Sequence, residues 1–238
     1  MGMHPKGAPI QGILPVKKPR GKNSFWLVAV LRRHLGVKKI GHAGTLDPFA
    51  TGVMVMLIGK TYTKLSDRFL GQEKEYRARV RLGVATDTYD CDGQVTMQSE
   101  AIPSLEQVTD CLTFYQGEID QIPPMFSAKK RQGKKLYELA RCGIEVPREP
   151  VKVTLTTSLL GYAYPYLDLN IACSKGTYIR SVAHDLGQWL GCGGYLTDLL
   201  RTRSGGFHLD NCFDGEEFNS PGFSPADLGP WLLTEQDQ

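Results

Sequence analysis

Residues 41–59 read GHAGTLDPFATGVMVMLIG, and this stretch decides the fold. In its second half, residues 53–58 form a short apolar run bounded by Gly52 and Gly59, which is typical of a strand buried inside a sheet. Its first half consists mainly of small residues and holds one acidic side chain, Asp47. The pattern therefore predicts a loop that presents Asp47 at the entrance of a buried strand.

Asp47 is also the first acidic residue of the chain, because residues 1–46 carry nine Lys and Arg and no Asp or Glu. A carboxylate behind a basic segment is what nucleophilic chemistry on a nucleic acid requires. Considered alone, an Asp-Pro pair is more often a turn or a helix cap. The loop favours chemistry, since its glycines let a ligand approach the backbone and Thr45 and Thr51 can hold it with side-chain hydrogen bonds.

The composition is that of a globular protein of one or two domains, with 41% hydrophobic and 22% charged residues among 238. The apolar runs are far shorter than the roughly 18 residues that span a bilayer, and residues 1–12 contain no apolar signal core. We therefore expect a cytoplasmic protein without a membrane segment. The net charge of +3 is unevenly distributed, because residues 205–238 carry seven Asp and Glu and no Lys or Arg.

Several common catalytic signatures are absent from the sequence. The six cysteines include no C-x-x-C pair and no Cys/His cluster at zinc spacing, so neither a zinc site nor a disulfide framework is expected. Gly59-Lys60-Thr61 resembles the end of a phosphate-binding P-loop, but that motif requires a glycine where this chain has Met54. Redox, metalloprotease, nucleoside-triphosphate and serine-hydrolase functions lose support.

Hydrophobic periodicity predicts a mixed sheet with helices, of the α/β or α+β class. The expected helices are residues 25–35 capped by Ser24, residues 105–115 after a Ser104/Gln107 capping box, residues 136–141 and residues 178–190. The expected strands, besides residues 53–58, are residues 75–83 and a hairpin of residues 151–155 and 167–171. Residues after Gly205 are expected to be irregular.

The stretch 41–52 closely resembles the catalytic motif of the TruB family of pseudouridine synthases. Further stretches resemble the same family's signatures, in the family's order: Lys18-Pro19, residues 74–76 with 81–83, residues 86–93 (TDTYDCDG), residues 121–130 (QIPPMFSAKK), residues 133–137 (GKKLY) and residues 173–180 (CSKGTYIR). Together they cover roughly residues 10–205. The resemblance implies the pseudouridine synthase fold, a mixed and mainly antiparallel sheet flanked by helices with a central RNA-binding cleft.

The resemblance also implies an activity, the conversion of the uridine at position 55 in the T-loop of tRNA to pseudouridine, without cofactor or metal. Asp47 corresponds to the nucleophile, which attacks either C6 of the ring or C1′ of the sugar, and the sequence leaves both routes open. Arg180 corresponds to the arginine that pairs with this aspartate, and Tyr76 to the aromatic residue that stacks on the base and assists removal of the C5 proton. Without the resemblance, Arg180 fits a surface position and Tyr76 fits strand core.

Other residues are expected, by the same resemblance, to contact RNA. His42 corresponds to a residue at the point where the base is flipped out, and Tyr178 and Leu199 align with the lining of the uracil pocket. Phosphate contacts are expected from Lys18 and Lys130. The same is expected of the basic residues near them, namely Lys17, Arg20, Lys22, Lys129, Arg131, Lys134 and Lys135.

Two departures from the family are expected to weaken tRNA binding without loss of chemistry. Many relatives carry a C-terminal RNA-binding PUA domain, whereas about 33 residues follow the matched part here, fewer than the roughly 50 of a domain. We therefore expect a leader at 1–10, a catalytic domain at 11–205 and an acidic extension at 206–238 without a complete PUA domain. Many relatives also have paired arginines where this chain has Leu200-Arg201, which removes one phosphate contact.

The expected partner is the T-arm of tRNA, with no membrane, no obligatory protein partner and a monomeric state. Two other hypotheses are an RNA chaperone with this fold, and a synthase directed at ribosomal RNA or at a guide-RNA complex. The presence of Asp47, Tyr76 and Arg180 together favours an enzyme, because a binding module does not need these three side chains.

Overall fold

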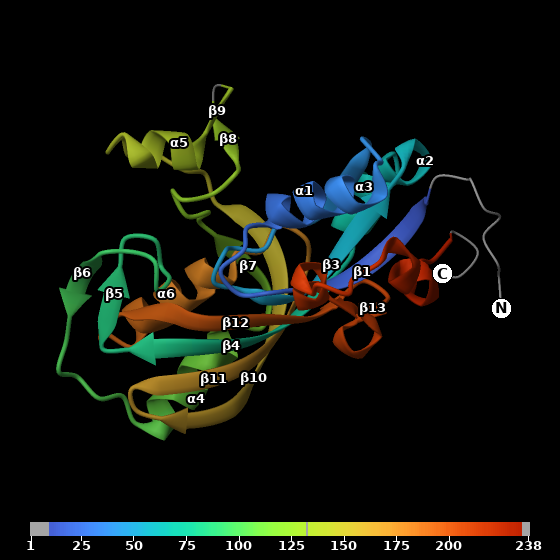
Figure 1. Ribbon diagram of the computed structural model, residues 1–238. Coiled ribbons are helices and arrows are strands. Elements are labelled where there is room, and N and C mark those ends of the chain that lie inside the picture. Colours follow the sequence, from blue (N-terminus) through green and yellow to red (C-terminus); the bar gives the residue numbers. More distant parts are fainter. Residues whose placement is uncertain (1–9, 132, 235–238) are drawn as a thin grey trace. The chain divides into compact units, whose positions relative to one another are not determined.

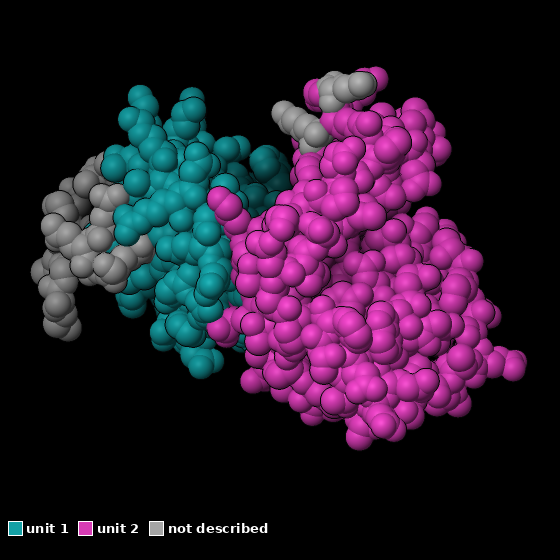
Figure 2. Space-filling model, turned by 180° about the vertical axis from the view of Figure 1, so that it is seen from behind, with its two compact units in different colours: residues 1–74, 200–238 teal, residues 75–199 magenta. Residues whose placement is uncertain are grey.

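The computed structural model describes residues 10–131 and 133–234 (Figure 1). The chain forms two compact units, which Figure 2 shows in different colours. Unit 1 consists of residues 1–74 and 200–238, and unit 2 consists of residues 75–199. Residues 1–9, which make up nearly all of the predicted leader, lie outside the described residues.

Unit 1 is built around the strand that follows the Asp47 loop. Its strands are β1 Gly12–Lys18, β2 Ile40–Ala43, β3 Thr51–Ile58, the end of β12 Gly194–Ser204, β13 Phe207–His208 and β14 Phe213–Asp214. Their order is β14-β1-β3-β12, with β2 also paired to β3 and β13 to β12. β3 is antiparallel to β1 and β2 and parallel to β12, which meets it at Thr51 and Gly52.

Within residues 10–74 and 200–234, three helices and three 3-10 turns accompany the strands of unit 1. They are α1 Ser24–Leu35, α2 Lys60–Thr63, α3 Ser66–Leu70, η1 Leu209–Asn211, η2 Gly215–Asn219 and η3 Pro225–Trp231. α1 and α3 lie beside β2 (Figure 1). The buried strand predicted at residues 53–58 is confirmed as part of β3, and each of these six side chains is at most 1% exposed. Strands on both edges and side chains on both faces exclude water from it.

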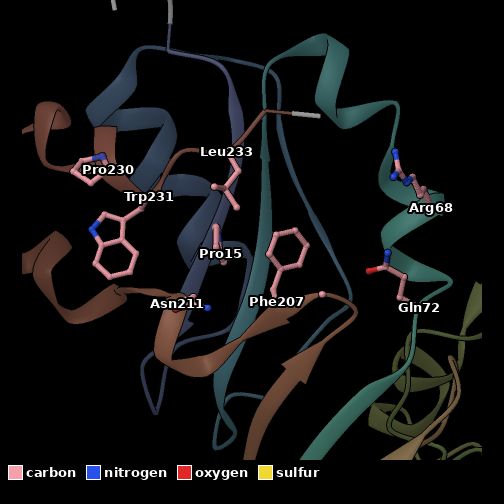
Figure 3. Close-up of a pocket in the computed structure, with 9 residues that line it drawn as sticks. Pro15, Arg68, Gln72, Phe207, Asn211, Pro230, Trp231 and Leu233 are labelled. Atoms are coloured by element: carbon pink, nitrogen blue, oxygen red, sulfur yellow. The ribbon is translucent and has the colours of Figure 1, made fainter. Parts of the chain in front are cut away.

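The residues after Gly205 contain short strands and 3-10 turns rather than only irregular structure. β14 pairs with β1 in parallel, and Leu233 exchanges backbone hydrogen bonds of 2.8 and 2.9 Å with Ile13. These contacts attach the end of the described chain to β1. A pocket of about 660 Å³ beside them (Figure 3) is lined by Pro15, Arg68, Gln72, Gly206, Phe207, Asn211, Pro230, Trp231 and Leu233.

Unit 2 contains the strands β4 Lys74–Leu82, β5 Val84–Thr86, β6 Val95–Gln98, β7 Gly117–Gln121, β8 Lys130–Arg131, β9 Lys134–Lys135, β10 Val151–Ala163 and β11 Tyr166–Cys173. Its helices are α4 Leu105–Phe114, α5 Leu136–Arg141 and α6 Ile179–Trp189. The main strands follow the order β12-β4-β11-β10-β7, while β5/β6 and β8/β9 form two small separate sheets. Antiparallel and parallel pairs occur together with helices, which confirms the predicted mixed α+β class.

Most elements that periodicity predicted in unit 2 are confirmed. β4 buries Tyr76 on one face and exposes Arg77 and Arg79 on the other. α4 begins with the predicted capping box, in which the side chains of Ser104 and Gln107 accept hydrogen bonds from each other's backbone N–H at 3.1 and 2.7 Å. The β10/β11 hairpin is longer than predicted, because both strands continue into the region expected to be the turn.

Several strands, including β1 and β12, were not predicted from the sequence, and the predicted cap of α1 is wrong. β1 contains Pro15 and ends in two lysines, and β12 contains Asp198 and two arginines, so neither has the apolar run of a buried strand. The cap of α1 is Asn23, whose side chain accepts a 2.8 Å hydrogen bond from the backbone N–H of Trp26. Ser24, the predicted cap, is the first residue of the helix, and its hydroxyl binds the backbone of Leu46 instead.

No helix in residues 10–131 and 133–234 is long and apolar enough to cross a membrane. The cysteines behave mostly as small buried side chains, as expected. Cys91 and Cys142 are exposed, whereas Cys111, Cys173, Cys192 and Cys212 are buried.

Candidate active site

The loop that carries Asp47 joins β2 to β3 in unit 1. Its apolar side chains Leu46, Phe49 and Ala50 are buried, whereas Asp47 is partly exposed among them. The backbone turns immediately after Asp47, because the carbonyl of Asp47 accepts a 3.1 Å hydrogen bond from the N–H of Ala50. The loop is thus anchored to the core by its apolar residues, while Asp47 as a residue stays partly exposed.

The side chain of Arg201, on β12, contacts this loop and binds its backbone. Its Nε donates to the carbonyl of Val53 at 2.6 Å. Its two terminal nitrogens donate to the carbonyls of Gly44 and Thr45 at 3.3 and 3.4 Å. The side chain is only 1% exposed, so Arg201 is a structural cation inside unit 1 rather than a surface residue.

The backbone of Leu46, before the aspartate, and that of Pro48, after it, are also bound. Ser24 Oγ donates to the carbonyl of Leu46 and accepts from the N–H of Leu46, both at 2.9 Å. The carbonyl of Pro48 accepts from the N–H of Gly21 at 2.8 Å and from Lys18 Nζ at 3.2 Å. The loop backbone is therefore fixed on both sides of its acidic residue.

Lys18 does not have the role that was predicted for it. The side chain is completely buried, and Nζ donates to the carbonyls of Pro19, Lys22 and Pro48 at 2.8, 2.6 and 3.2 Å. These bonds use all three ammonium protons, so none remains for an RNA phosphate. Burial lowers the pKa of Lys18 to about 8, and the nearby carboxylate of Asp47 opposes this shift.

His42 lies on β2, within the same unit as Asp47. Burial lowers the pKa of its imidazole, and the positive charge of Arg201 lowers it further. Its Nδ1 is buried and has no hydrogen-bond partner among the described residues. A neutral imidazole at physiological pH suits a contact with a nucleobase better than a salt bridge to phosphate.

Arg180 lies in the first turn of α6, in unit 2, and is 5% exposed. Its terminal nitrogens donate to the carbonyls of Phe126 and Thr88 at 2.8 and 3.1 Å, and one of them lies 3.5 Å from a carboxylate oxygen of Asp90. Asp90 accepts further bonds from Thr88 Oγ1 at 2.6 Å and from the N–H of Asp92 at 3.0 Å. The stretch 86–93, noted above only as a signature, therefore holds the guanidinium in place.

The other predicted pocket residues also belong to unit 2. Tyr76 on β4 and Leu199 on β12 are 7% and 4% exposed. Tyr178 immediately precedes α6, and its backbone is fixed by Gln121, which accepts from the N–H of Tyr178 at 2.8 Å and donates to its carbonyl at 3.1 Å. Sequence reasoning did not single out Gln121 as a residue that positions Tyr178, although it begins one of the signature stretches.

The structure thus brings the predicted residues together in two groups. Asp47, His42 and Lys18 lie in unit 1, whereas Tyr76, Tyr178, Arg180 and Leu199 lie in unit 2. The pairing of Asp47 with Arg180 stays a prediction. Lys130 lies in β8, and its side chain is outside the described part of the structure. Its neighbours Lys129, Arg131 and Lys134 are exposed.

Among the described residues, no group of three or more His, Cys, Asp and Glu side chains is placed to hold a metal ion. The candidate residues form one group in each unit, a carboxylate on an anchored loop in unit 1 and, separately, an arginine with aromatic and apolar side chains in unit 2. The first group offers nucleophilic attack, and the second offers charge stabilisation and a surface for a planar base.

Residues 32–179 match the family model described as TruB family pseudouridylate synthase (N terminal domain), and residues 180–220 match that of the tRNA pseudouridylate synthase B C-terminal domain. A tRNA pseudouridine synthase B from Protochlamydia amoebophila is 64% identical over 211 residues, covering 89% of this chain and 80% of that protein. One from Chlamydia muridarum is 57% identical over 215 residues, covering 90% of this chain and 89% of that protein.

Among solved structures, a chain in the crystal structure of a Cbf5-Nop10-Gar1 complex superposes with a TM-score of 0.71 at 24% sequence identity. The match covers 94% of this chain and 60% of that one. At this identity the likeness concerns the fold alone, and it confirms the pseudouridine synthase fold expected from the sequence.

Proposed function

Because the chain belongs to the TruB family of pseudouridylate synthases, we propose that it isomerises the uridine at position 55, in the T-loop of tRNA, with Asp47 as the nucleophile. That it is an enzyme converting uridine in tRNA to pseudouridine follows from the family and from relatives that match most of its length. The proposed parts are the position of the uridine and the roles of individual residues.

The reaction requires few chemical groups, because it changes no oxidation state. The N1–C1′ bond breaks, a C5–C1′ bond forms, C5 loses a proton and N1 gains one. A nucleophile has to assist bond cleavage, a pocket has to retain the detached ring, and a base or water has to accept the C5 proton. We assign the first task to Asp47, by attack at C6 or at C1′, and the second to Tyr76, Tyr178 and Leu199.

The observation that carries the assignment of Asp47 is the anchoring of its loop. Buried side chains from three separate elements bind the backbone before and after this residue, while the residue itself is partly exposed. Anchoring of this kind is costly for an ordinary surface turn, because it buries two cations. It is the arrangement expected where a reacting atom must be held in a fixed position.

Arg180 is proposed to stabilise the ionised form of Asp47 during the reaction. Its guanidinium is buried and fixed by carbonyl oxygens and by the carboxylate of Asp90, so it carries a charge that does not need to reorganise. A preorganised cation stabilises the carboxylate in its ionised form, both before it attacks and when it is released again. Tyr76, buried on the core face of β4, offers the ring on which the uracil stacks.

The proposal for Asp47 is tested by replacing it with Asn and measuring tritium release from tRNA that contains 5-tritiated uridine. We expect turnover to fall by more than about 1,000-fold, because the variant keeps the shape but loses the nucleophile. Binding of tRNA is expected to change little. Asp67→Asn, at an exposed aspartate of α3, serves as the matched control and keeps full activity. Undiminished tritium release by Asp47→Asn would remove this residue from the mechanism.

The position of the modified uridine is tested separately on a tRNA transcript without partner proteins. Sequencing-based mapping is expected to find pseudouridine in the T-loop at position 55, and a transcript with cytidine there is expected to release no tritium. Modification of ribosomal RNA in preference to tRNA would instead support the rival substrate.

A further inference from the structure

We propose that Ser24 and Arg201 are positioning residues for the reaction, which hold the backbone of the loop so that Asp47 stands at the correct place for attack. This inference rests on the proposed role of Asp47 as the nucleophile. Neither residue contacts the substrate in this proposal, and both act through the loop.

The placement of Arg201 follows from the parallel pairing of β12 with β3. Arg201 pairs with Gly52, which has a φ of 102°. A Cβ added at Gly52 would lie only 2.2 Å from the carbonyl oxygen of Arg201, so only glycine allows the two strands to approach this closely. The approach brings the guanidinium to the carbonyls of Gly44 and Thr45, on the N-terminal side of Asp47.

The burial of Arg201 shows that its guanidinium binds groups inside the protein rather than RNA. From the sequence, this position bears only on phosphate contacts, yet the side chain is 1% exposed and its nitrogens donate to three carbonyl oxygens. A buried guanidinium is retained only where such bonds offset its loss of hydration. Here all three acceptors belong to the loop or to β3, the strand that follows it, so their geometry is coupled to that of Asp47.

Ser24 binds the peptide units that flank Leu46, the residue next to Asp47. Because Asn23 caps α1, the hydroxyl of Ser24 is not needed for capping. It instead donates to the carbonyl and accepts from the N–H of Leu46, both at 2.9 Å, and Ser24 is 4% exposed. A single hydroxyl thus satisfies two buried polar groups of the loop, which apolar replacement would leave without this partner.

The geometry makes Ser24 and Arg201 complementary rather than redundant. Arg201 fixes residues 44 and 45, Ser24 fixes residue 46, and the bonds to the carbonyl of Pro48 fix the other side. Loss of one anchor shifts the loop without removing a chemical group. A displacement of about 1 Å costs up to about 100-fold in rate when reacting atoms must be aligned.

Ser24→Ala tests the inference by steady-state kinetics of tritium release. We expect kcat to fall by about 10-fold or more, while KM for tRNA changes by less than about 2-fold, because the variant alters alignment and not the RNA-binding surface. The matched control is Thr157→Val, which removes a buried hydroxyl that accepts a 2.8 Å bond from Gln116 in unit 2. The control is expected to lose stability but to keep kcat. Equal kcat in the two variants overturns the inference.

Hydrogen exchange of the free protein, without RNA, tests the anchoring itself. In Ser24→Ala, the amide protons of residues 44–47, 49 and 50 are expected to exchange at least about 10-fold faster, while those of β3 keep the wild-type rate. Unchanged protection of the loop overturns the proposal. Faster exchange with normal kcat also overturns it, but leaves the role of Asp47 intact, which Asp47→Asn tests independently.

Arg201→Lys provides a second variant, because it keeps the positive charge but replaces the planar guanidinium, whose three separate nitrogens bind the carbonyls of Val53, Thr45 and Gly44, by a single ammonium of different geometry. We expect a fall in kcat at least as large as for Ser24→Ala, with the same local loss of protection. Ser204→Ala, at a buried serine of the same strand, is the control and is expected to retain wild-type kcat. If Arg201→Lys folds and has wild-type kcat, Arg201 is not a positioning residue.

Discussion

The two units hold their candidate catalytic groups in different ways. In unit 1 the side chains of Ser24, Lys18 and Arg201 bind the backbone on both sides of Asp47. In unit 2 backbone carbonyls and the carboxylate of Asp90 bind the charged head of Arg180 itself. A nucleophile that forms and breaks a bond needs a fixed backbone position, whereas a residue that stabilises charge needs a fixed charge. The difference suggests that removal of a head group harms chemistry more than removal of one loop anchor.

Arg180→Met is the strongest test of this comparison, and we expect turnover to fall by about 100- to 1,000-fold with a smaller change in tRNA binding. The methionine fills similar space but carries no charge to stabilise Asp47. Arg79→Met is the control, since Arg79 forms an exposed ion pair with Asp168 at 2.7 Å on the outer face of β4. Tritium release measures both. Normal turnover of a folded Arg180→Met would show that unit 2 supplies no catalytic charge.

Gly52→Ala tests whether β3 and β12 must approach closely for Arg201 to reach the loop. We expect the free energy of unfolding to fall by about 2 kcal/mol or more, because alanine is strained at a φ of 102° and its Cβ would meet the carbonyl of Arg201 at 2.2 Å. Chemical denaturation measures the change. Gly222→Ala, whose Cβ would meet nothing within 4 Å, is expected to be neutral. Equal stability of the two variants would mean that the β3/β12 approach is not tightly set.

The smallest expected effect is that of Asp185, on the same helix as Arg180, whose ionisation changes the free energy of unfolding. Burial raises the pKa of its carboxyl to about 6. The folded protein therefore binds more protons than the unfolded chain between about pH 4 and 6, so this residue reduces stability as pH rises through that window. Asp185→Asn is expected to raise the free energy of unfolding at pH 7 by about 1 kcal/mol, after allowance for partial exposure. The gain should vanish near pH 4, and a gain that is equal at both pH values would exclude titration of Asp185 as its cause.

Much of the fold was predictable, because several elements follow hydrophobic periodicity. The apolar run of β3, the alternation of β4 and the capping box before α4 depend on local patterns, and the structure confirms all three. β1 and β12 were missed because their buried faces contain charged residues. Lys18 and Arg201 carry charges that a sequence pattern places on the surface, and only the carbonyl groups around them explain their burial.

For the candidate site, the sequence proposes residues but not the contacts that hold them. Resemblance in ordered motifs pointed to Asp47, Tyr76 and Arg180, whose roles stay predictions. It did not indicate that Asp90 holds Arg180 or that Ser24 binds the peptides next to Asp47, because these contacts join residues far apart in the chain. A serine before a helix has the same local pattern whether its hydroxyl caps the helix or binds a distant loop.

The sequence by itself determined the family and the mixed sheet, and it led to the proposal that Asp47 is the nucleophile, since these depend on residue types and their order. The tertiary structure decided which polar side chains are buried and what they bind. It changed Lys18 from a phosphate contact to a loop anchor and showed Arg201 to be an internal cation rather than an RNA contact. The physical reason is that the cost of burying a charge depends on acceptors supplied by remote parts of the chain, and only the folded chain brings them together.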